Sequence, residues 1–192
     1  MTNIEIGLRE QILETANNLL VEKGYPGMSM RDIAEALGVS KAALYYHFQD
    51  KEELFLAILE KYLEEMSSSL DQILSETGSS ADRVRHFIEF VLIQPAEQRA
   101  TIRLASQDIS QLNPERRKAF GAIYQEKFLE KIGVMLKQGM ESGEFREIRL
   151  DVAIWALLGI MFPYFYPAHS GGEAVPEQTI QEVQEIFLNG IR

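Results

Sequence analysis

Apolar residues recur three and four positions apart along almost the whole chain, and the alternating runs typical of strands are missing. One such stripe includes Leu8, Ile12 and Ala16, and another, far along the chain, includes Ile180 and Val183. This spacing places apolar side chains on one face of a helix, so it predicts an all-α fold. The pattern predicts about nine helices, over residues 8–24, 29–37, 41–47, 50–76, 82–93, 96–111, 114–141, 150–166 and 176–191.

Glycine, proline and capping residues mark the ends of these segments. Gly24 is expected to end the first helix, because glycine readily takes the left-handed conformation that closes many helices. Asp50 is expected to cap the fourth helix, and Glu53 follows it at the spacing of a capping box. Pro114 suits the first turn of the seventh helix, where its missing N–H has no intrahelical partner. Residues 167–176 are predicted to form a loop.

The second and third predicted helices are short and are joined by Gly38-Val39-Ser40. A turn of three or four residues that contains glycine is typical of a helix-turn-helix, in which two helices meet at a steep angle. Gly38 can adopt a positive φ without a steric penalty. Ser29 and Ser40 are suited to cap the two helices, and a capped helix N-terminus directs N–H groups toward an anion. The segment therefore predicts a DNA-binding unit.

In such a unit the exposed face of the helix over residues 41–47 enters the major groove of DNA. Its outward side chains are candidates to read bases, since lysine can pair with guanine and the alanine methyl can contact thymine. Aromatic hydroxyl, imidazole and ammonium groups beside it are candidates to contact phosphates. The predicted DNA-binding residues are Ser29, Ser40, Lys41, Ala42, Tyr45, Tyr46, His47 and Lys51.

Residues 28–54 carry the strings DIAEALGVS, LYYHF and DKEEL. In spacing and residue type they resemble the DNA-binding signature of the TetR family of bacterial transcriptional regulators. The resemblance implies an all-helical homodimer, with a three-helix DNA-binding head over residues 1–50. It also implies a ligand-binding and dimerising body over residues 51–192. By this likeness Tyr45, His47 and Lys51 match phosphate-contact positions. The resemblance also implies that the protein is a repressor, which binds a palindromic operator and is released from it by a small-molecule effector.

The net charge of −10 argues against DNA binding, because contact with phosphates needs cations. Residues 1–51 hold five basic and seven acidic side chains, which leaves most of the acidity outside the predicted head. DNA affinity would then depend on a few placed cations and on helix N-termini. The alternative is a helical small-molecule-binding dimer whose DNA binding is absent or vestigial.

The body is rich in aromatic residues, which suggest an apolar effector pocket with a few polar groups, the usual composition of a ligand site. His86 and Arg103 are the candidates for those polar groups. The alternative interpretation is that the aromatics form ordinary core and that His86 is a satisfied core or surface histidine. The effector, of unknown identity and largely apolar, is predicted to contact His86, Phe87, Phe90, Arg103, Tyr124, Phe128 and Met135.

The last two helices are predicted to form the homodimer interface. The helix over residues 150–166 is more apolar than a single core-facing stripe requires, and the helix over residues 176–191 carries a complementary stripe. Two recognition helices about 34 Å apart would read a palindrome, which one alone cannot do. The alternative is a purely intramolecular core. The predicted interface residues are Ile154, Trp155, Leu158, Met161, Ile180, Val183 and Phe187.

The remaining motifs point away from catalysis and membranes. The sequence has no cysteine, and its three histidines, His47, His86 and His169, lack the spacing of a metal site. Nucleophile-elbow, Walker and dinucleotide patterns are missing. The apolar run over residues 152–162 is shorter than the ~20 residues of a membrane span, and no basic region precedes an apolar run near Met1. We expect a cytoplasmic protein that is not an enzyme and needs no cofactor or metal.

Overall fold

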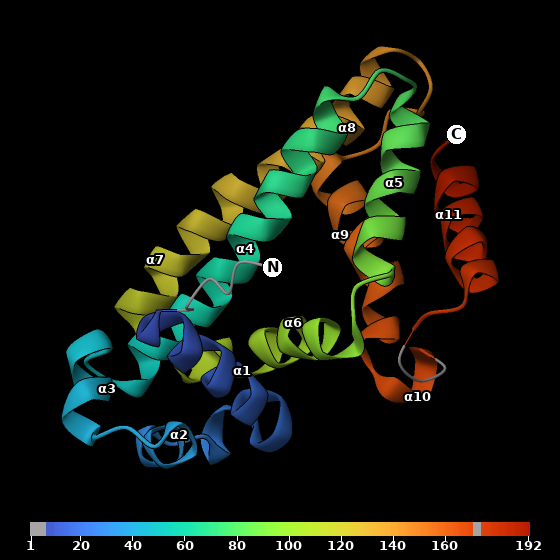
Figure 1. Cartoon of the computed structure of the whole chain (residues 1–192). Coiled ribbons are helices and arrows are strands. Elements are labelled where there is room, and N and C mark those ends of the chain that lie inside the picture. Colours follow the sequence, from blue (N-terminus) through green and yellow to red (C-terminus); the bar gives the residue numbers. More distant parts are fainter. Residues whose placement is uncertain (1–6, 171–173) are drawn as a thin grey trace.

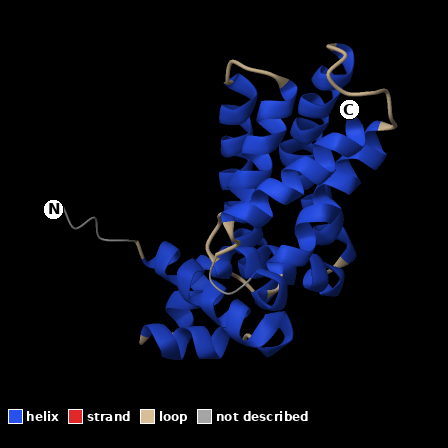
Figure 2. Cartoon of the chain, turned by 90° about the vertical axis from the view of Figure 1, so that its right-hand side faces the viewer, coloured by secondary structure: helices blue, strands red, loops and turns tan. Residues whose placement is uncertain are grey.

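A computed structural model describes residues 7–170 and 174–192, and this part of the chain contains helices and loops but no strand (Figure 2). The all-α prediction is confirmed. The α-helices are α1 (Leu8–Gly27), α2 (Met30–Leu37), α3 (Lys41–His47), α4 (Lys51–Ser75), α5 (Ser80–Leu92), α6 (Ala96–Asp108), α7 (Pro114–Tyr124), α8 (Glu130–Glu141), α9 (Leu150–Met161), α10 (Pro167–Ser170) and α11 (Glu177–Ile191).

Three short segments of other helical types join these elements. The 3₁₀ turns η1 (Ile109–Gln111) and η3 (Phe162–Phe165) extend α6 and α9, and the π-helix η2 (Gln125–Leu129) joins α7 to α8. The single helix expected over residues 114–141 therefore contains a π-helical interruption, a feature that often marks functional sites. The loop expected over residues 167–176 begins with the short helix α10, and its positions 171–173 lie outside the described residues.

The predicted punctuation of the first four helices is largely present. Gly24 has φ 69° and ψ 169°, which interrupts α1 where the sequence placed its end, although helical structure resumes as far as Gly27. The Asp50 carboxylate accepts a hydrogen bond from the Glu53 N–H at 2.8 Å and caps α4. Glu53 in turn accepts from the Gln49 N–H at 2.6 Å. The start of α4 is thus held by two hydrogen bonds to side chains.

Two hydrophobic cores divide the molecule, and α4 belongs to both. The head core joins α1, α2 and α3 to the first turns of α4 as far as Leu59, and the body core begins at Leu63 on the same helix. In Figure 1, α4 runs diagonally from the head along the length of the body, beside α7 and α8. A rigid helix that is shared in this way is suited to carry movement between the two parts.

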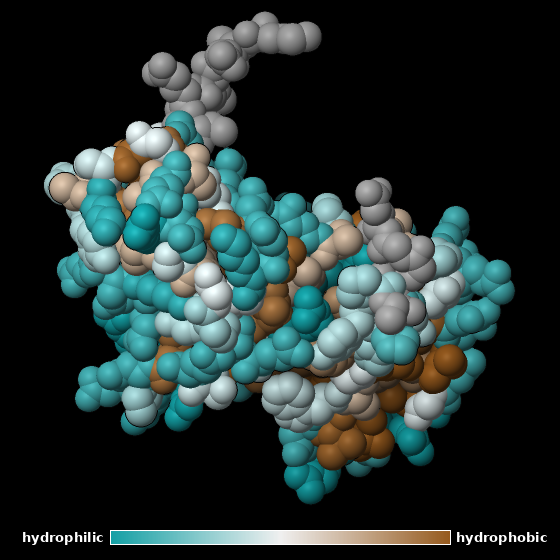
Figure 3. Space-filling model, turned by 90° about the horizontal axis from the view of Figure 1, so that it is seen from below, coloured by the Kyte–Doolittle hydropathy of each residue, from teal (hydrophilic) through white to brown (hydrophobic). Residues whose placement is uncertain are grey.

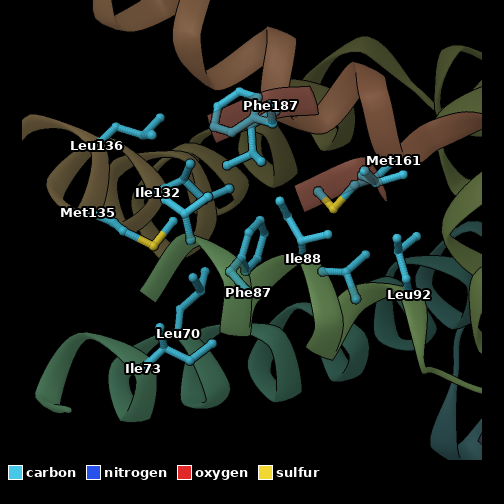
Figure 4. Close-up of a cluster of buried hydrophobic side chains, with 14 of the residues drawn as sticks. Leu70, Ile73, Phe87, Ile88, Leu92, Ile132, Met135, Leu136, Met161 and Phe187 are labelled. Carbon is cyan, nitrogen blue, oxygen red and sulfur yellow. The ribbon is translucent and has the colours of Figure 1, made fainter. Parts of the chain in front are cut away.

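The body core surrounds α5. Phe87 and Ile88 on α5 are fully buried, and Figure 4 shows Phe87 between side chains from α4, α8 and α11. Helix α6 lies across the lower end of the body and contacts α1 of the head (Figure 1). The head is therefore attached to the body through both α4 and α6.

Candidate DNA-binding head and effector body

The turn between α2 and α3 has the geometry that the sequence predicted. Gly38 adopts φ 66° and ψ 26°, and the Val39 N–H donates to the Ala34 carbonyl at 3.0 Å. Ser29 accepts from the Asp32 N–H at 3.1 Å, and Ser40 accepts from the Ala43 N–H at the same distance. A left-handed C-terminal glycine and two serine caps therefore fix the angle between α2 and α3.

Helix α3 presents a reading face to solvent. Leu44 is completely buried and anchors the helix, while the Tyr46 side chain is 86% exposed and Tyr45 is 48% exposed. Lys41 and Ala42 are also exposed. Tyr45 and Tyr46 are neighbouring exposed aromatics, and contiguous exposed apolar surface often marks an interaction site. The outward residues of α3 are thus available to a major groove.

His47 and Lys51 are less accessible than the sequence implied. His47 is half-buried, and its ring lies edge-on to Tyr46, with centroids 5.3 Å apart. The Lys51 ammonium lies 4.2 Å from the centroid of the Tyr25 ring and donates to the Pro26 carbonyl at 3.4 Å. Desolvation by burial lowers the pKa of Lys51. The ammonium is therefore held against the end of α1.

Hydrogen bonds across the junction of head and body were not predicted from the sequence. The Thr101 hydroxyl on α6 donates to the Asn17 side-chain oxygen on α1 at 2.8 Å. The Tyr25 N–H donates to an Asp108 carboxylate oxygen at 3.2 Å. Arg116 on α7 makes two short hydrogen bonds to the Asp50 carboxylate. These partners are more than 60 positions apart in the chain, so no local pattern could reveal them.

A cavity of about 320 Å³ lies at the same junction, between α1, α4 and α6. Leu13, Ile58 and Tyr62 form its apolar part, and charged or amide side chains line the rest. This hollow lies beside the contact between α1 and α6. Helices α1 and α6 nevertheless pack directly against each other, so their positions are linked.

The apolar and aromatic residues predicted to contact the effector separate into two groups. Phe87 and Met135 are fully buried in the core, and Phe128 is 9% exposed beside them. Tyr124 and Phe90 are partly buried at its edge, and the rings of Tyr124 and Phe128 lie 5.2 Å apart. Desolvation raises the pKa of Tyr124 to about 12, so its hydroxyl stays neutral. The placement of the buried aromatics fits core packing, the alternative that the sequence left open.

The two polar residues have opposite placements. His86 is exposed, and its Nδ1 lies 2.6 Å from a Glu76 carboxylate oxygen, so it does not face a body pocket as predicted. It sits on the outer side of α5 because Phe87 and Ile88 occupy the inner side. The Arg103 guanidinium instead lies 5.1 Å from the Tyr166 ring centroid, and its Nε is buried without a hydrogen-bond partner among the described residues.

The predicted dimer residues also need a correction. Met161 on α9 and the stripe of Ile180, Val183 and Phe187 on α11 are buried in the core of the chain itself, because α9 and α11 pack on α5. A partner subunit has no access to them in this structure. Ile154 and Leu158 on α9 are half-buried and pack at the edge of the same core.

The outer faces of these two helices are nevertheless apolar. On α9, Val152 is 53% exposed and Trp155 is 59% exposed, and on α11 Ile186 is 65% exposed. Ala156 and Gly159 continue the α9 stripe with small side chains. Figure 3 shows hydrophobic surface gathered on the body, whereas most of the visible head surface is hydrophilic. Of the predicted interface residues, Trp155 alone is largely exposed, and the prediction did not include the exposed Val152 and Ile186.

The buried helix-turn-helix core, the exposed recognition face and the attached helical body define a DNA-binding regulator. The comparisons with known proteins agree with this class. The family model for bacterial regulatory proteins of the tetR family matches residues 12–58. A second model, for the tetracyclin repressor-like C-terminal domain, matches residues 77–191. The chain belongs to the TetR family.

Relatives of known structure or function share the whole architecture. The transcriptional repressor KstR2 of Mycobacterium tuberculosis is 24% identical over 95% of this chain and 92% of its own length. The regulator PfmR of Thermus thermophilus is 31% identical, with a TM-score of 0.79 over 97% of this chain and 98% of that one. AibR, solved with isovaleryl coenzyme A and operator DNA, is 23% identical, with a TM-score of 0.77 over 93% and 96%.

The chain is therefore a DNA-binding transcriptional regulator of the TetR family rather than an enzyme. Within residues 7–170 and 174–192, no helix is long and apolar enough to cross a bilayer. The same residues contain no group of three or more acidic or histidine side chains arranged to hold a metal ion.

Proposed function

We propose that the dimer places α3 of each subunit in successive major grooves of a palindromic operator, inside the cytoplasm. One observation carries this: the Tyr46 side chain is 86% exposed beside exposed Lys41 and Ala42, while Leu44 is fixed in the core. In this proposal Lys41, Ala42 and Tyr46 read bases. Ser29, Ser40, Tyr45 and His47 contact phosphates, together with the N-terminus of α4.

Lys51 has a different part in this proposal from the one that the sequence suggested. Its ammonium contacts the Tyr25 ring and the Pro26 carbonyl, so its main role is to stabilise the packing of the head. It adds positive charge at the start of α4, where the helix N-terminus already favours an anion. Residues 1–50 and 51–192 serve as the DNA-binding and effector domains, with the first turns of α4 completing the head core.

Selection from a random DNA pool, followed by gel shift over a range of salt concentrations, tests this function. We expect enrichment of a palindrome whose half-sites are one helical turn apart, with affinity that falls as salt rises. Binding without sequence preference, or none at low salt, would favour the alternative of a helical small-molecule-binding dimer with vestigial DNA binding.

Replacement of Tyr46 by alanine should relax the sequence preference of the protein. Loss of a base contact costs about 1–3 kcal/mol of discrimination, whereas phosphate contacts remain. The measurement is affinity for the selected palindrome and for single-base variants, in low salt. Tyr46→Phe is the matched control because it keeps the ring. If the Tyr46→Ala protein discriminated between the palindrome and its single-base variants as well as the unaltered protein does, Tyr46 would not be a base-reading residue.

The dimer forms, in this proposal, through the outer faces of α9 and α11. Val152 and Trp155 on α9 and Ile186 on α11 supply exposed apolar surface on neighbouring helices. Gly159 and Gly190 are exposed on the same two helices and permit close approach of a second backbone. A tryptophan is also the residue type most enriched at the energetic centres of interfaces.

The effector, in this proposal, is an apolar molecule with an anionic group that Arg103 recognises. The Arg103 guanidinium is half-buried, and within the described part of the chain it lies against Gln107, at 3.4 Å, and the Tyr166 ring rather than a carboxylate. A partly desolvated guanidinium in such surroundings favours an anion. Arg103 also lies on α6, whose movement would reach α1 through Thr101. Isovaleryl coenzyme A, which the relative AibR holds, is a suitable first probe.

Replacement of Arg103 by methionine should weaken the response to such a ligand. We expect isovaleryl coenzyme A to release the unaltered protein from its operator, and the Arg103→Met protein to need about tenfold more, the loss of one charged hydrogen bond. Arg85→Met is the control, since Arg85 is bonded to Asp82 on another face. If isovaleryl coenzyme A released the Arg103→Met protein at the same concentration as the Arg85→Met protein, Arg103 would be excluded as the recognition group.

A further inference from the structure

A side chain of the body forms hydrogen bonds to the start of α4, directly after the connection from the recognition helix α3. Arg116 on α7 donates from Nη1 to Asp50 Oδ1 at 2.7 Å and from Nη2 to Asp50 Oδ2 at 2.9 Å. Its Nη1 also donates to Glu52 Oε2 at 3.3 Å. A paired, fork-like contact between guanidinium and carboxylate is both stronger and more directional than a single charge contact.

The residues that Arg116 contacts determine where α4 begins. The contacts of Arg116 with Asp50 and Glu52 are called the clamp below. The Asp50 carboxylate also caps α4 by accepting a hydrogen bond from the Glu53 N–H at 2.8 Å, so one group belongs to both the helix cap and the clamp. Glu52 additionally accepts from the Asn113 N–H at 3.2 Å, directly before α7. The starts of α4 and α7 are therefore tied together, only a few residues after α3 ends at His47.

Apolar packing covers part of this side of the junction, where Leu112 is buried in the head core and Phe120 of α7 packs against it. A cavity of about 200 Å³ adjoins the clamp and is lined by Arg9 and Phe48 of the head and by Arg116 itself, among others. The side chains of Arg116 and Asp50 are 36% and 48% exposed. Directed ionic hydrogen bonds therefore supplement this apolar contact in setting the angle between head and body. The junction's other side is held through α6.

We propose that Arg116 is a positioning residue for operator recognition, which fixes the orientation of each head and so the separation of the two recognition helices. This inference rests on the proposed DNA-binding function. Simultaneous reading of both half-sites requires the recognition helices to match the helical repeat of about 34–36 Å. A head that is free to tilt would still bind one half-site, but two such heads would seldom match a palindrome together.

The test compares DNA substrates that differ only in geometry. For Arg116→Met we expect about tenfold weaker binding to the palindrome, unchanged binding to a single half-site, and a flatter response when one base pair is added to or removed from the half-site spacing. Arg116→Lys keeps the charge but loses the paired, fork-like contact. Its affinity for the palindrome should therefore lie between those of Arg116→Met and the unaltered protein. Arg117→Met is the matched control, because the Arg117 side chain donates to the Ser110 carbonyl instead of the start of α4.

A second measurement needs no DNA. The sequence has no cysteine, so Ala36→Cys on the exposed side of α2 gives one unique spin-label site per subunit. The distance between the two labels in the dimer should have a narrow distribution, and Arg116→Met should broaden it, with little change in the unfolding temperature because the clamp is partly solvent-exposed.

The proposal is overturned if the label distances of Arg116→Met match those of the unaltered dimer. It is equally overturned if this variant loses half-site and palindrome binding to the same extent, which would indicate a direct DNA contact or a disrupted head. If the unaltered protein binds no DNA selectively, the proposed function fails, whereas the distance measurement still decides the role of Arg116.

Discussion

The Trp155→Glu protein is expected to be a monomer at micromolar concentration and to bind its operator about a hundredfold more weakly. Trp155 is 59% exposed on α9 and lies on the same face as Val152, so it contributes little to the core of its own chain. A carboxylate at the centre of an apolar interface loses its hydration without gaining a partner. The two heads then bind independently, and the avidity of a linked pair, typically about 10²–10⁴-fold, is lost.

Sedimentation velocity and gel shift measure the two parts of this expectation. Ile93→Glu is the control, since Ile93 is similarly exposed but directly follows α5 and belongs to neither α9 nor α11. The single-half-site affinity of the Trp155→Glu protein should equal that of the unaltered protein. A Trp155→Glu protein that sediments as a dimer would move the interface to another surface.

This interface also illustrates what the sequence could and could not predict. Hydrophobic periodicity identified the stripe of Ile180, Val183 and Phe187, and the structure confirms that these residues share one face of α11. It did not reveal that this face meets the chain's own α5. Helix α9 is apolar on nearly all sides, so periodicity could not separate Met161, which points inward, from Trp155, which points outward.

The head was more predictable because its determinants are local. The conformation of Gly38 and the caps from Ser29 and Ser40 involve partners within a few positions, so residue type and spacing were sufficient to predict them. The junction was not predictable, since Thr101 meets Asn17 across 84 positions. His86 was misplaced for a related reason: one polar residue in an apolar helix does not show which side that helix buries.

The Phe87→Ala protein is expected to lose about 3–5 kcal/mol of unfolding free energy, the usual cost of removing a buried phenylalanine. Phe87 is completely buried on α5, and Figure 4 shows it among Leu70, Ile132 and Phe187, from three other helices. These helices fix one another's positions through this ring. Its removal would therefore leave a cavity at the point where α4, α8 and α11 meet α5.

Urea denaturation measures the loss, and Phe90→Ala is the control because Phe90, one turn further along α5, is only partly buried. The comparison separates the two roles that the aromatics of the body can have. A core residue lowers stability with or without effector, whereas a pocket residue leaves the free protein stable and weakens the effector response. If Phe87→Ala kept full stability and lost that response, the centre of the body would be a ligand site, and a closed core around α5 would be excluded. The packing of Phe87 against three helices favours the first outcome, which leaves the contact of Arg103 with Tyr166 as the place for an effector to act on α6.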